Sequence, residues 1–437
     1  MIRAMKDSGI AWIGEIPENW KIERLKNCFI KRDGGNWGEE ANGQDGDCIC
    51  LRIADFDYER FNFKDRDNYT IRHYDPNIVK KWYLKKDDIV IEKSGGGDNT
   101  PVGRTVIFDK NFNATFVNFT DRLRCSTNIL PKYMQYVLVT FYKNRYSFNY
   151  VKQTTGIQNL DLTAMLSNEQ TPFPPLYTQK SIVDFLDNKC KQIDYVLEKT
   201  RESIEEYKQL KNAVITHAVT KGIRSNRKMK DSGIEWIGEI PEEWEDINPK
   251  ALFTQRKEKA KNGEKQLTAS QQHGIIFQDE YMELTGARIV TVQKDFDILK
   301  HVEAGDFVIS MRSFQGGLEY STNTGSISSA YVMLIPNLTL VVPKFFKWLL
   351  KSELYINALQ STSNLVRDGQ AMRYSNFAQI RLLKIPLAEQ SEIADYLDKK
   401  CSQIDNLISK KEQLITELET YKKSLIYEYV TGKKEVK

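Results

Sequence analysis

The chain has 437 residues, of which 41% are hydrophobic and 28% are charged, and its formal net charge is +4. This composition excludes a disordered chain, and the small positive charge is compatible with a nucleic-acid partner but does not predict one. The sequence contains no run of 18 apolar residues and begins without an apolar signal-peptide core, so we expect a cytoplasmic protein without a membrane segment.

The sequence lacks the motifs of common catalytic and metal sites. The six cysteines lie at positions 28, 48, 50, 125, 190 and 401. They form no paired metal-ligand motif and are too sparse for a secreted disulfide scaffold, so a reducing compartment fits best. The glycine-rich segment 95–105 has Asp98 and Arg104 where a phosphate loop needs Gly and Lys. We therefore expect a non-catalytic chain that binds no metal or cofactor.

Two segments of the chain occur twice. Residues 5–20 (MKDSGIAWIGEIPENW) return as residues 229–244 (MKDSGIEWIGEIPEEW) with fourteen identities in sixteen positions, and residues 179–194 return as residues 390–405. The stretches between them have diverged. The chain is therefore a tandem duplication, in which similar framing segments enclose two different domains.

Within each repeat, β-rich sequence with Gly and Asn punctuation follows the WIGEIP segment. Residues 83–92 and 302–310 are β-branched, end at turn residues and predict matching strands. Residues 131–138 and 343–350 begin with Pro-Lys and continue with aromatic and aliphatic residues at helical spacing, which predicts two matching helices.

Each repeat ends in a heptad pattern that predicts a helix of about 40 residues, or roughly 60 Å. The predicted seam of the first helix contains Leu186, Ile193, Val196, Thr200, Tyr207, Leu210 and Val214. That of the second contains Leu397, Ile404, Leu407, Lys411, Leu414, Leu418, Tyr421 and Leu425. Thr200 and Lys411 occupy the same seam position, where a polar residue can determine register; they are also compatible with simple solvated interruptions.

Chain order determines how such helices pair. The first helix leaves the first domain and the second must return toward it, so we expect an antiparallel coiled coil with a pseudo-two-fold axis. The predicted fold is α+β, with two β-rich domains that are each followed by a long helix. We expect a first domain at 1–175, a central helix at 176–225, a second domain at 226–386 and a distal helix at 387–437.

The framing segments resemble those of the specificity subunit of type I restriction-modification systems. The resemblance rests on WIGEIP at 12–17 and 236–241, and on the segments PLYTQKSIVDFLD and PLAEQSEIADYLD, repeated in this order over essentially the whole chain. The first link has Tyr-Thr-Gln where the family commonly has a Glu before the Gln.

The resemblance implies a DNA reader. In that family each variable domain is a target-recognition domain for one half of a split, asymmetric double-stranded DNA site, and the helices set the gap between the halves. They also dock two modification subunits, which carry S-adenosylmethionine and methylate adenine. Restriction subunits, where present, add chemistry driven by ATP and Mg²⁺.

Candidate DNA-binding residues lie on loops, where binding groups concentrate, and are of the types that contact bases and phosphates. In the first domain they are Lys93, Ser94, Arg104, Thr155, Gln158 and Asn159. In the second they are Arg312, Ser313, Gln315, Arg367 and Arg373. The alternative is that these loops are ordinary solvated turns.

The WIGEIP segments contribute Trp12, Ile13 and Trp20, with their repeat equivalents Trp236, Ile237 and Trp244. The simplest interpretation is that they pack each domain onto the helix ends, and the alternative is that they dock the modification subunit. Two other functions remain open: a coiled-coil scaffold with two protein-binding heads, and an independent DNA-binding regulator. The scaffold predicts no DNA affinity, whereas phosphate contacts would make DNA binding fall steeply with salt.

Overall fold

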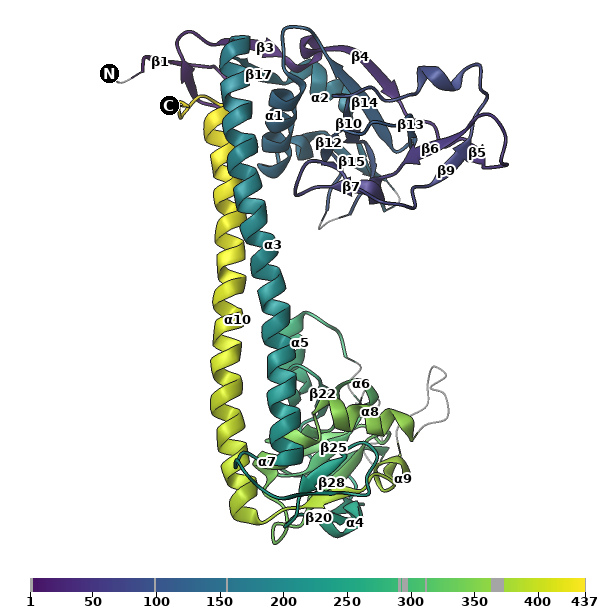
Figure 1. Ribbon diagram of the computed structural model, residues 1–437, viewed down its shortest axis with the longest axis vertical. Coiled ribbons are helices and arrows are strands. Elements are labelled where there is room, and N and C mark those ends of the chain that lie inside the picture. Colours follow the sequence, from purple (N-terminus) through teal and green to yellow (C-terminus); the bar gives the residue numbers. More distant parts are fainter. Residues whose placement is uncertain are drawn as a thin grey trace. The chain divides into compact units, whose positions relative to one another are not determined.

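The computed structural model describes residues 3–97, 100–154, 156–289, 292, 298–310, 313–362 and 373–436. The chain divides into two compact units (Figure 1). Unit 1 is Met1–Arg201 with Glu412–Lys437, and unit 2 is Glu202–Lys411. The division falls inside the helices α3 (Leu176–Lys221) and α10 (Leu387–Val430), so each unit contains part of both. The four-segment division expected from the sequence stays a prediction.

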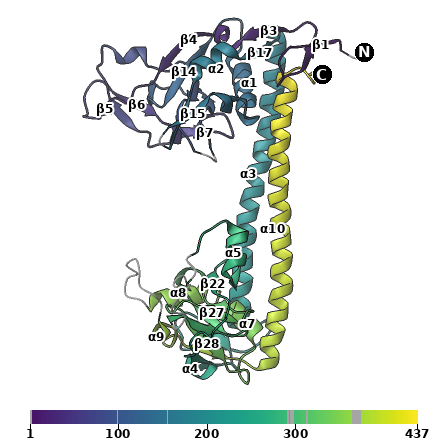
Figure 2. The same cartoon turned by 180° about the vertical axis from the view of Figure 1, so that it is seen from behind.

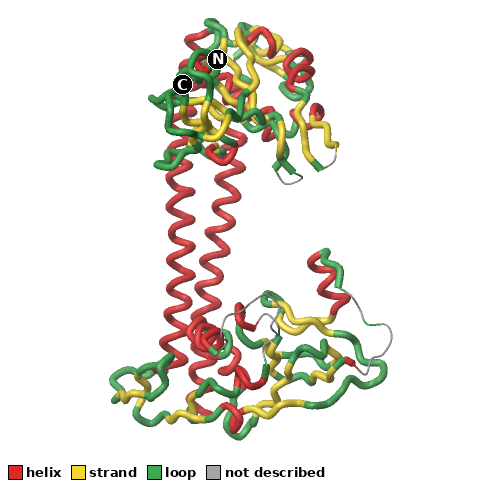
Figure 3. Tube along the Cα trace, turned by 90° about the vertical axis from the view of Figure 1, so that its right-hand side faces the viewer, coloured by secondary structure: helices red, strands yellow, loops and turns green. Residues whose placement is uncertain are grey.

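Strands and loops make up most of each unit outside the two long helices (Figure 3). The strands of unit 1 are β1 Met5–Asp7, β2 Glu15–Pro17, β3 Lys21–Arg24, β4 Phe29–Gly34, β5 Glu39–Glu40, β6 Asp47–Leu51, β7 Phe56–Asp57, β8 Asn62–Phe63, β9 Ile71–His73, β10 Ile89–Glu92, β11 Ser94–Gly95, β12 Thr105–Ile107, β13 Ala114–Phe116, β14 Thr120–Cys125, β15 Val151–Thr154, β16 Ile157–Leu160 and β17 Gln170–Phe173. Its shorter helices are α1 Pro131–Lys143 and α2 Leu162–Asn168.

The main sheet of unit 1 has the strand order β4-β14-β10-β12-β8-β7, and a second sheet has the order β13-β6-β9-β5. The neighbouring pairs are antiparallel except β12 with β8 and β13 with β6, which are parallel. A third sheet, β11-β16-β15, carries the loops that the sequence singles out for DNA binding.

Unit 2 has shorter sheets. Its strands are β18 Met229–Asp231, β19 Glu239–Pro241, β20 Glu245–Ile247, β21 Phe253–Arg256, β22 Leu267–Ser270, β23 Gly274–Phe277, β24 Lys300–Val302, β25 Phe307–Ile309, β26 Glu319–Tyr320, β27 Gly325–Ile327, β28 Val332–Pro336 and β29 Leu382–Lys384. Its shorter helices are α4 Pro249–Leu252, α5 Gln278–Thr285, α6 Ser313–Gly316, α7 Pro343–Leu349, α8 Glu353–Ser361 and α9 Tyr374–Phe377.

The duplication is visible in how the strands pair. β1 pairs with β2 and β18 pairs with β19 in the same register, and β3–β17 has its counterpart in β20–β29. The order β4-β14-β10 returns as β21-β28-β25. The predicted strands at 83–92 and 302–310 are confirmed over β10 and β25, and the predicted helices over α1 and α7. The framework is therefore common to both units, and the strands added to it differ.

Helices α3 and α10 are antiparallel within each unit (Figures 1 and 2). In unit 1, the Lys422 Nζ atom lies 2.6 Å from Asp194 Oδ1. In unit 2, the repeat equivalents Lys211 and Asp405 are 2.7 Å apart. The same ion pair thus joins the two helices in both units, which confirms the predicted antiparallel pairing.

The shared row of the predicted seam is confirmed, because Leu186, Ile193, Leu397, Ile404 and Leu425 are all buried. Tyr207, Val214 and Leu418 in the same row are half-buried. This row of apolar side chains therefore faces the partner helix along both α3 and α10.

The second row of the predicted seam is wrong. Val196 is 42% exposed, Leu210 49%, Leu407 41% and Leu414 40%, and Tyr421 is also exposed. The buried second row lies one residue later and contains Cys190, Leu197, Ile204, Cys401 and Lys422. Apolar residues occupy the rows on both sides of the shared row, so the heptad spacing could not decide which side faces the partner helix.

Two hydrophobic clusters form the core of each unit. The larger cluster of unit 1 joins α1 to α3 and includes Leu425, Ile426 and Val430 of α10. The hydroxyl of Tyr133 on α1 donates to the Val430 carbonyl at 3.0 Å. The end of α10 is therefore part of the core of unit 1.

In the described part of the chain, no helix is long and apolar enough to cross a membrane.

Candidate nucleic-acid interface

The WIGEIP segments pack against helix ends. In unit 1, the Tyr427 hydroxyl donates to the Trp12 carbonyl at 3.1 Å. Gly432, with φ +72°, lies so close to Trp20 that a Cβ there would be 2.9 Å from the ring. In unit 2, Gly222, with φ +75°, lies similarly against Trp244. Only glycine can adopt a positive φ while its backbone lies this close to a tryptophan ring. Trp12, Ile13, Trp20, Ile237 and Trp244 are buried, and Trp236 is half-buried.

A buried glutamine links each β-rich domain to its long helix. The Gln179 side chain accepts a hydrogen bond from the Leu130 amide at 2.7 Å and donates to the Asn128 and Pro174 carbonyls at 3.2 and 2.9 Å. Leu130 is the N-cap of α1. This side chain therefore ties the start of α1 to the start of α3.

The repeat equivalent in unit 2 makes the same contacts. Gln390 accepts from the Val342 amide at 2.7 Å and donates to the Leu340 and Ile385 carbonyls, each at 2.8 Å. Val342 is the N-cap of α7. The glutamine of the PLxxQ-type segment thus has one structural role in both halves, which is to join each domain to the start of a long helix.

The residue before this glutamine differs between the halves. Glu389 accepts from Trp244 Nε1 at 3.1 Å and pairs with Arg227. The corresponding residue of the first half is Thr178. Trp20 Nε1 is buried there without a hydrogen-bond partner among the described residues, and the Arg3 guanidinium lies 5.3 Å from the centroid of the Trp20 ring. Thr178 in place of a Glu therefore removes the carboxylate that would accept a hydrogen bond from Trp20.

Sheet β11-β16-β15 presents part of the predicted DNA-binding set of the first domain. The Ser94 hydroxyl donates to Asn159 Oδ1 at 2.6 Å, and Asn159 is exposed. The Lys93 Nζ atom lies 2.6 Å from Asp121 Oδ1, with its side chain 30% exposed. Ser94 and Asn159 are therefore in contact with each other, whereas the Lys93 side chain contacts Asp121 of β14. Whether they contact DNA stays a prediction.

Two other predicted residues of the first domain have structural roles. Arg104 forms two hydrogen bonds with Glu92, at 2.8 and 3.0 Å, and its guanidinium lies 3.8 Å from the centroid of the Tyr58 ring. Burial raises the pKa of the Glu92 carboxyl, while the hydrogen bond from Arg104 opposes that shift. Gln158 is buried, and its side-chain oxygen accepts from the Val102 amide at 3.4 Å. The polar groups of Arg104 and Gln158 are therefore engaged inside the domain, which favours a supporting role, and whether either residue contacts DNA stays a prediction.

In the second domain, Ser313 is buried and its hydroxyl accepts from the Ser310 amide at 2.9 Å, so it supports the loop that leads to α6. Gln315 and Arg373 are exposed. Arg373 is the N-cap of α9, and its amide donates to Asn376 Oδ1 at 3.1 Å. Thr155, Arg312 and Arg367 lie outside the described residues.

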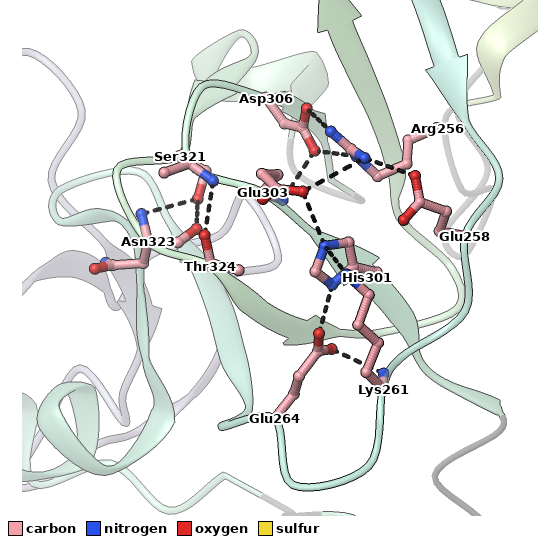
Figure 4. A network of polar contacts seen from close by, with 11 residues as sticks. Arg256, Glu258, Lys261, Glu264, His301, Glu303, Asp306, Ser321, Asn323 and Thr324 are labelled. Atoms are coloured by element: carbon pink, nitrogen blue, oxygen red, sulfur yellow. Dashed lines mark hydrogen bonds and ion pairs between the residues drawn. The ribbon is translucent and has the colours of Figure 1, made fainter.

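A polar network, missed in the sequence, supports the second domain (Figure 4). The fully buried His301 ring on β24 lies between two carboxylates, with Nδ1 2.6 Å from Glu264 and Nε2 3.2 Å from Glu303. Next to it, Arg256 on β21 makes two hydrogen bonds to Asp306, at 2.7 and 3.0 Å. The only sequence signal was a histidine among acids that are distant along the chain. The network holds the connection after β21 against β24.

An apolar pocket of the first domain was also missed. It has a volume of about 400 Å³ and lies beside the turn that contains Phe119, one of the few aromatic side chains that are nearly half exposed.

Among the described residues, no group of three or more His, Cys, Asp or Glu side chains could hold a metal ion. The fold thus contains two different β-rich domains built on one repeated framework.

The sequence of this chain is similar to those of known proteins. The family model described as "Type I restriction modification DNA specificity domain" matches residues 17–206. A putative type I restriction enzyme MjaX specificity subunit of Methanocaldococcus jannaschii is 24% identical over 239 residues, covering 53% of this chain and 52% of that protein. The MjaVIII specificity subunit of the same organism is 30% identical over 118 residues, or 26% of each protein. The chain thus spans about half the length of the first of these relatives.

Solved structures share the fold. A chain from a study of "complex assembly and conformational transition of the type I R-M system" matches with a TM-score of 0.68 and 13% identity, over 95% of this chain and 98% of that one. The HsdS subunit from Thermoanaerobacter tengcongensis matches with a TM-score of 0.53 and 13% identity, over the same shares. Residues 17–206 of this chain are thus similar to type I restriction-modification DNA specificity domains, and its fold is similar to that of the HsdS subunit.

Proposed function

We propose that this chain is the DNA-recognition subunit of a type I restriction-modification system, and that it reads a split, asymmetric double-stranded site. Each domain reads one half of the site. The long helices set the distance between the halves, and the chain itself catalyses no reaction. It acts in the cytoplasm, where its DNA substrate lies.

One observation carries this proposal: the same framework holds two different surfaces. Gln179 and Gln390 make equivalent contacts in the two units, and the WIGEIP segments pack in the same way. The sheets added to this framework differ, as β11-β16-β15 in unit 1 and β22-β23 in unit 2 illustrate. A repeated support with different loops suits two unlike half-sites, since binding residues concentrate on loops set by a rigid scaffold.

The partners follow from this function. Two modification subunits bind the chain and methylate adenine with S-adenosylmethionine, and restriction subunits, where present, bring ATP and Mg²⁺. The exposed apolar row on α3 and α10, which includes Val196, Leu210, Leu407 and Leu414, supports the binding of further subunits, because apolar residues on a helix surface favour protein contacts.

The test is to co-express the chain with the modification subunit encoded beside it, in a host without other adenine methylation, and to map methylated adenines across the genome. We expect one split motif with a fixed gap. Replacement of residues 18–175 by another first domain should change only one half of the motif. A stable complex with an active modification subunit but without sequence-specific methylation would favour a protein-binding scaffold instead.

A further inference from the structure

The apolar pocket of the first domain lies beside the loop that the sequence singles out for DNA binding. Its apolar lining comes from Trp37, Ile53, Ala54, Val117 and Phe119. The loop after β10 borders it, because a Cβ at Gly95 would lie 3.9 Å from Ile53 Cδ1. Gly95 of the predicted DNA-binding loop therefore lies beside Ile53, one of the residues that line the pocket.

The pocket is built by the backbone and does not depend on a collapsed side chain. The Lys93 and Ser94 amides both donate to the Phe119 carbonyl, at 2.9 and 3.1 Å. A Cβ at Gly35 would lie 2.2 Å from the Val117 carbonyl oxygen, so only glycine lets this strand pass so close to the turn. These contacts hold the backbone of the turn that carries Phe119, whose side chain is 48% exposed. An exposed aromatic ring that lines a pocket favours an apolar occupant.

Basic side chains lie beside residues that line the pocket. Lys64 Nζ and Arg66 Nη2 lie 3.2 and 2.9 Å from the Ala54 carbonyl, and the Arg52 side chain lines the pocket. The carboxylate at the centre of this group is Asp55, which is fully buried and lies 3.2 Å from Arg66. Of the acids in the same segment, Asp65 pairs with Lys110 at 2.6 Å, and Asp67 is exposed. Three cations against Asp55 and Asp67 leave an excess of one positive charge, which favours an anionic partner. DNA is an anionic polymer, and the 5-methyl group of thymine is a small apolar group in its major groove. DNA that contains thymine therefore offers both properties.

We infer that the half-site read by the first domain contains a thymine, and that its 5-methyl group occupies this pocket against Phe119. The inference rests on the proposed function and deepens it, because it assigns one base pair of the target to named residues. Asn118, exposed on the same turn, is placed beside the edge of that base pair. The surrounding cations contact phosphate and carry no sequence information.

The test uses the complex of this chain with its modification subunit. Methylation mapping first gives the split motif, and exchange of residues 18–175 shows which half the first domain reads. Duplexes then carry deoxyuridine in place of each thymine of that half in turn, which removes only the 5-methyl group. We expect affinity to fall about fourfold at one position, the effect of about one buried methyl group, and to stay unchanged at the others.

Phe119→Ala links that effect to the pocket. In this variant the ratio of affinities for the thymine and deoxyuridine duplexes should fall to about one, whereas Ile30→Ala, which removes a side chain that is 68% exposed outside the pocket, should keep the fourfold ratio. Thermal unfolding confirms that both variants fold.

Three results would overturn the inference: a half-site without a T·A pair, no deoxyuridine effect in the unaltered complex, or a fourfold ratio that persists in Phe119→Ala. Each of them leaves the proposed function intact, because a split methylation motif would still be present. Absence of any such motif would instead contradict the proposed function.

Discussion

Single buried side chains determine how firmly each domain is attached to its helix. Gln179 and Gln390 each satisfy three backbone groups at the junction of a domain and a long helix. A buried backbone group that loses its partner costs about 1 to 3 kcal/mol. The shape of the junction therefore depends on one amide side chain per unit.

We expect Gln179→Ala to lower the free energy of unfolding of unit 1 by about 2 kcal/mol, because the Leu130 amide would stay buried without an acceptor. Urea unfolding followed by circular dichroism measures this change. Gln192→Ala, on the exposed face of the same helix, is the matched control and should change stability by less than about 0.5 kcal/mol. Equal losses in both variants would contradict the assigned role.

The difference between Thr178 and Glu389 predicts a stabilising substitution. Thr178→Glu would give the buried Trp20 Nε1 an acceptor and Arg3 a counterion, as Glu389 does for Trp244 and Arg227. We expect a gain of about 1.5 kcal/mol in the free energy of unfolding, since hydrogen bonds to charged groups contribute about 1.5 to 3 kcal/mol. Glu389→Thr should destabilise unit 2. Both changes are read as shifts in thermal unfolding, and a loss of stability in Thr178→Glu would refute the equivalence of the two sites.

At the scale of secondary-structure elements, the seam between α3 and α10 decides which helix face stays free. Leu197 is buried in the seam, whereas its neighbour Val196 is exposed. The two rows differ little in apolar character. Which row packs against the partner helix therefore determines which apolar row remains available on the surface.

Adjacent residues test this register. Leu197→Ala should lower the free energy of unfolding by about 3 kcal/mol, because it removes buried methyl groups and leaves a cavity. Val196→Ala should change it by less than about 0.5 kcal/mol in the isolated chain. Chemical denaturation of the two variants gives both values. The opposite order would mean that the seam lies on the Val196 side after all.

The network of Figure 4 makes the attachment of β24 sensitive to acid. The hydrogen bond with His301 lowers the pKa of the Glu303 carboxyl below 4.5 in the folded state. A group with a depressed folded pKa adds stability above its unfolded pKa, and that contribution is lost as the pH falls through the folded pKa.

The stability difference between the unaltered chain and Glu303→Gln should therefore be constant above about pH 5 and shrink toward about pH 3. Thermal unfolding across this range measures it. Glu283→Gln, at an exposed acid of α5 outside the network, should show no such trend. A difference that grows toward low pH would contradict the assigned contact.

At the scale of the whole molecule, the C-terminal part of α10 contributes to the core of unit 1, which is otherwise formed by the first half of the chain. Unit 1 is formed by Met1–Arg201 together with Glu412–Lys437. Leu425, Ile426 and Val430 belong to its core, and Lys422 joins Asp194 to the Glu59 carbonyl. Segments separated by more than 200 residues therefore fold as one unit.

Deletion of residues 412–437 should accordingly unfold or loosen unit 1 and leave unit 2 folded, because only unit 1 loses core residues. Hydrogen exchange should show loss of protection in α1 and retained protection in α7, which serves as the internal control. Protection of α1 that survives the deletion would mean that residues 1–201 fold without the end of α10.

The sequence alone determined the duplication, the two long helices and their antiparallel pairing, since identical segments and heptad spacing are local signals. The same segments also indicated the resemblance to type I restriction-modification specificity subunits. The buried role of the WIGEIP tryptophans followed because large apolar residues beside a helix end have few other environments.

Only the tertiary structure decided the rest. Heptad spacing could not choose between the Val196 row and the Leu197 row, because both are apolar and the choice depends on the partner helix. Arg104 and Gln158 look like DNA readers in the sequence, but Glu92 and the Val102 amide engage them in the fold. The pocket at Phe119 combines residues from three distant loops. Such sites depend on which segments meet in space, and a linear sequence does not contain that information locally.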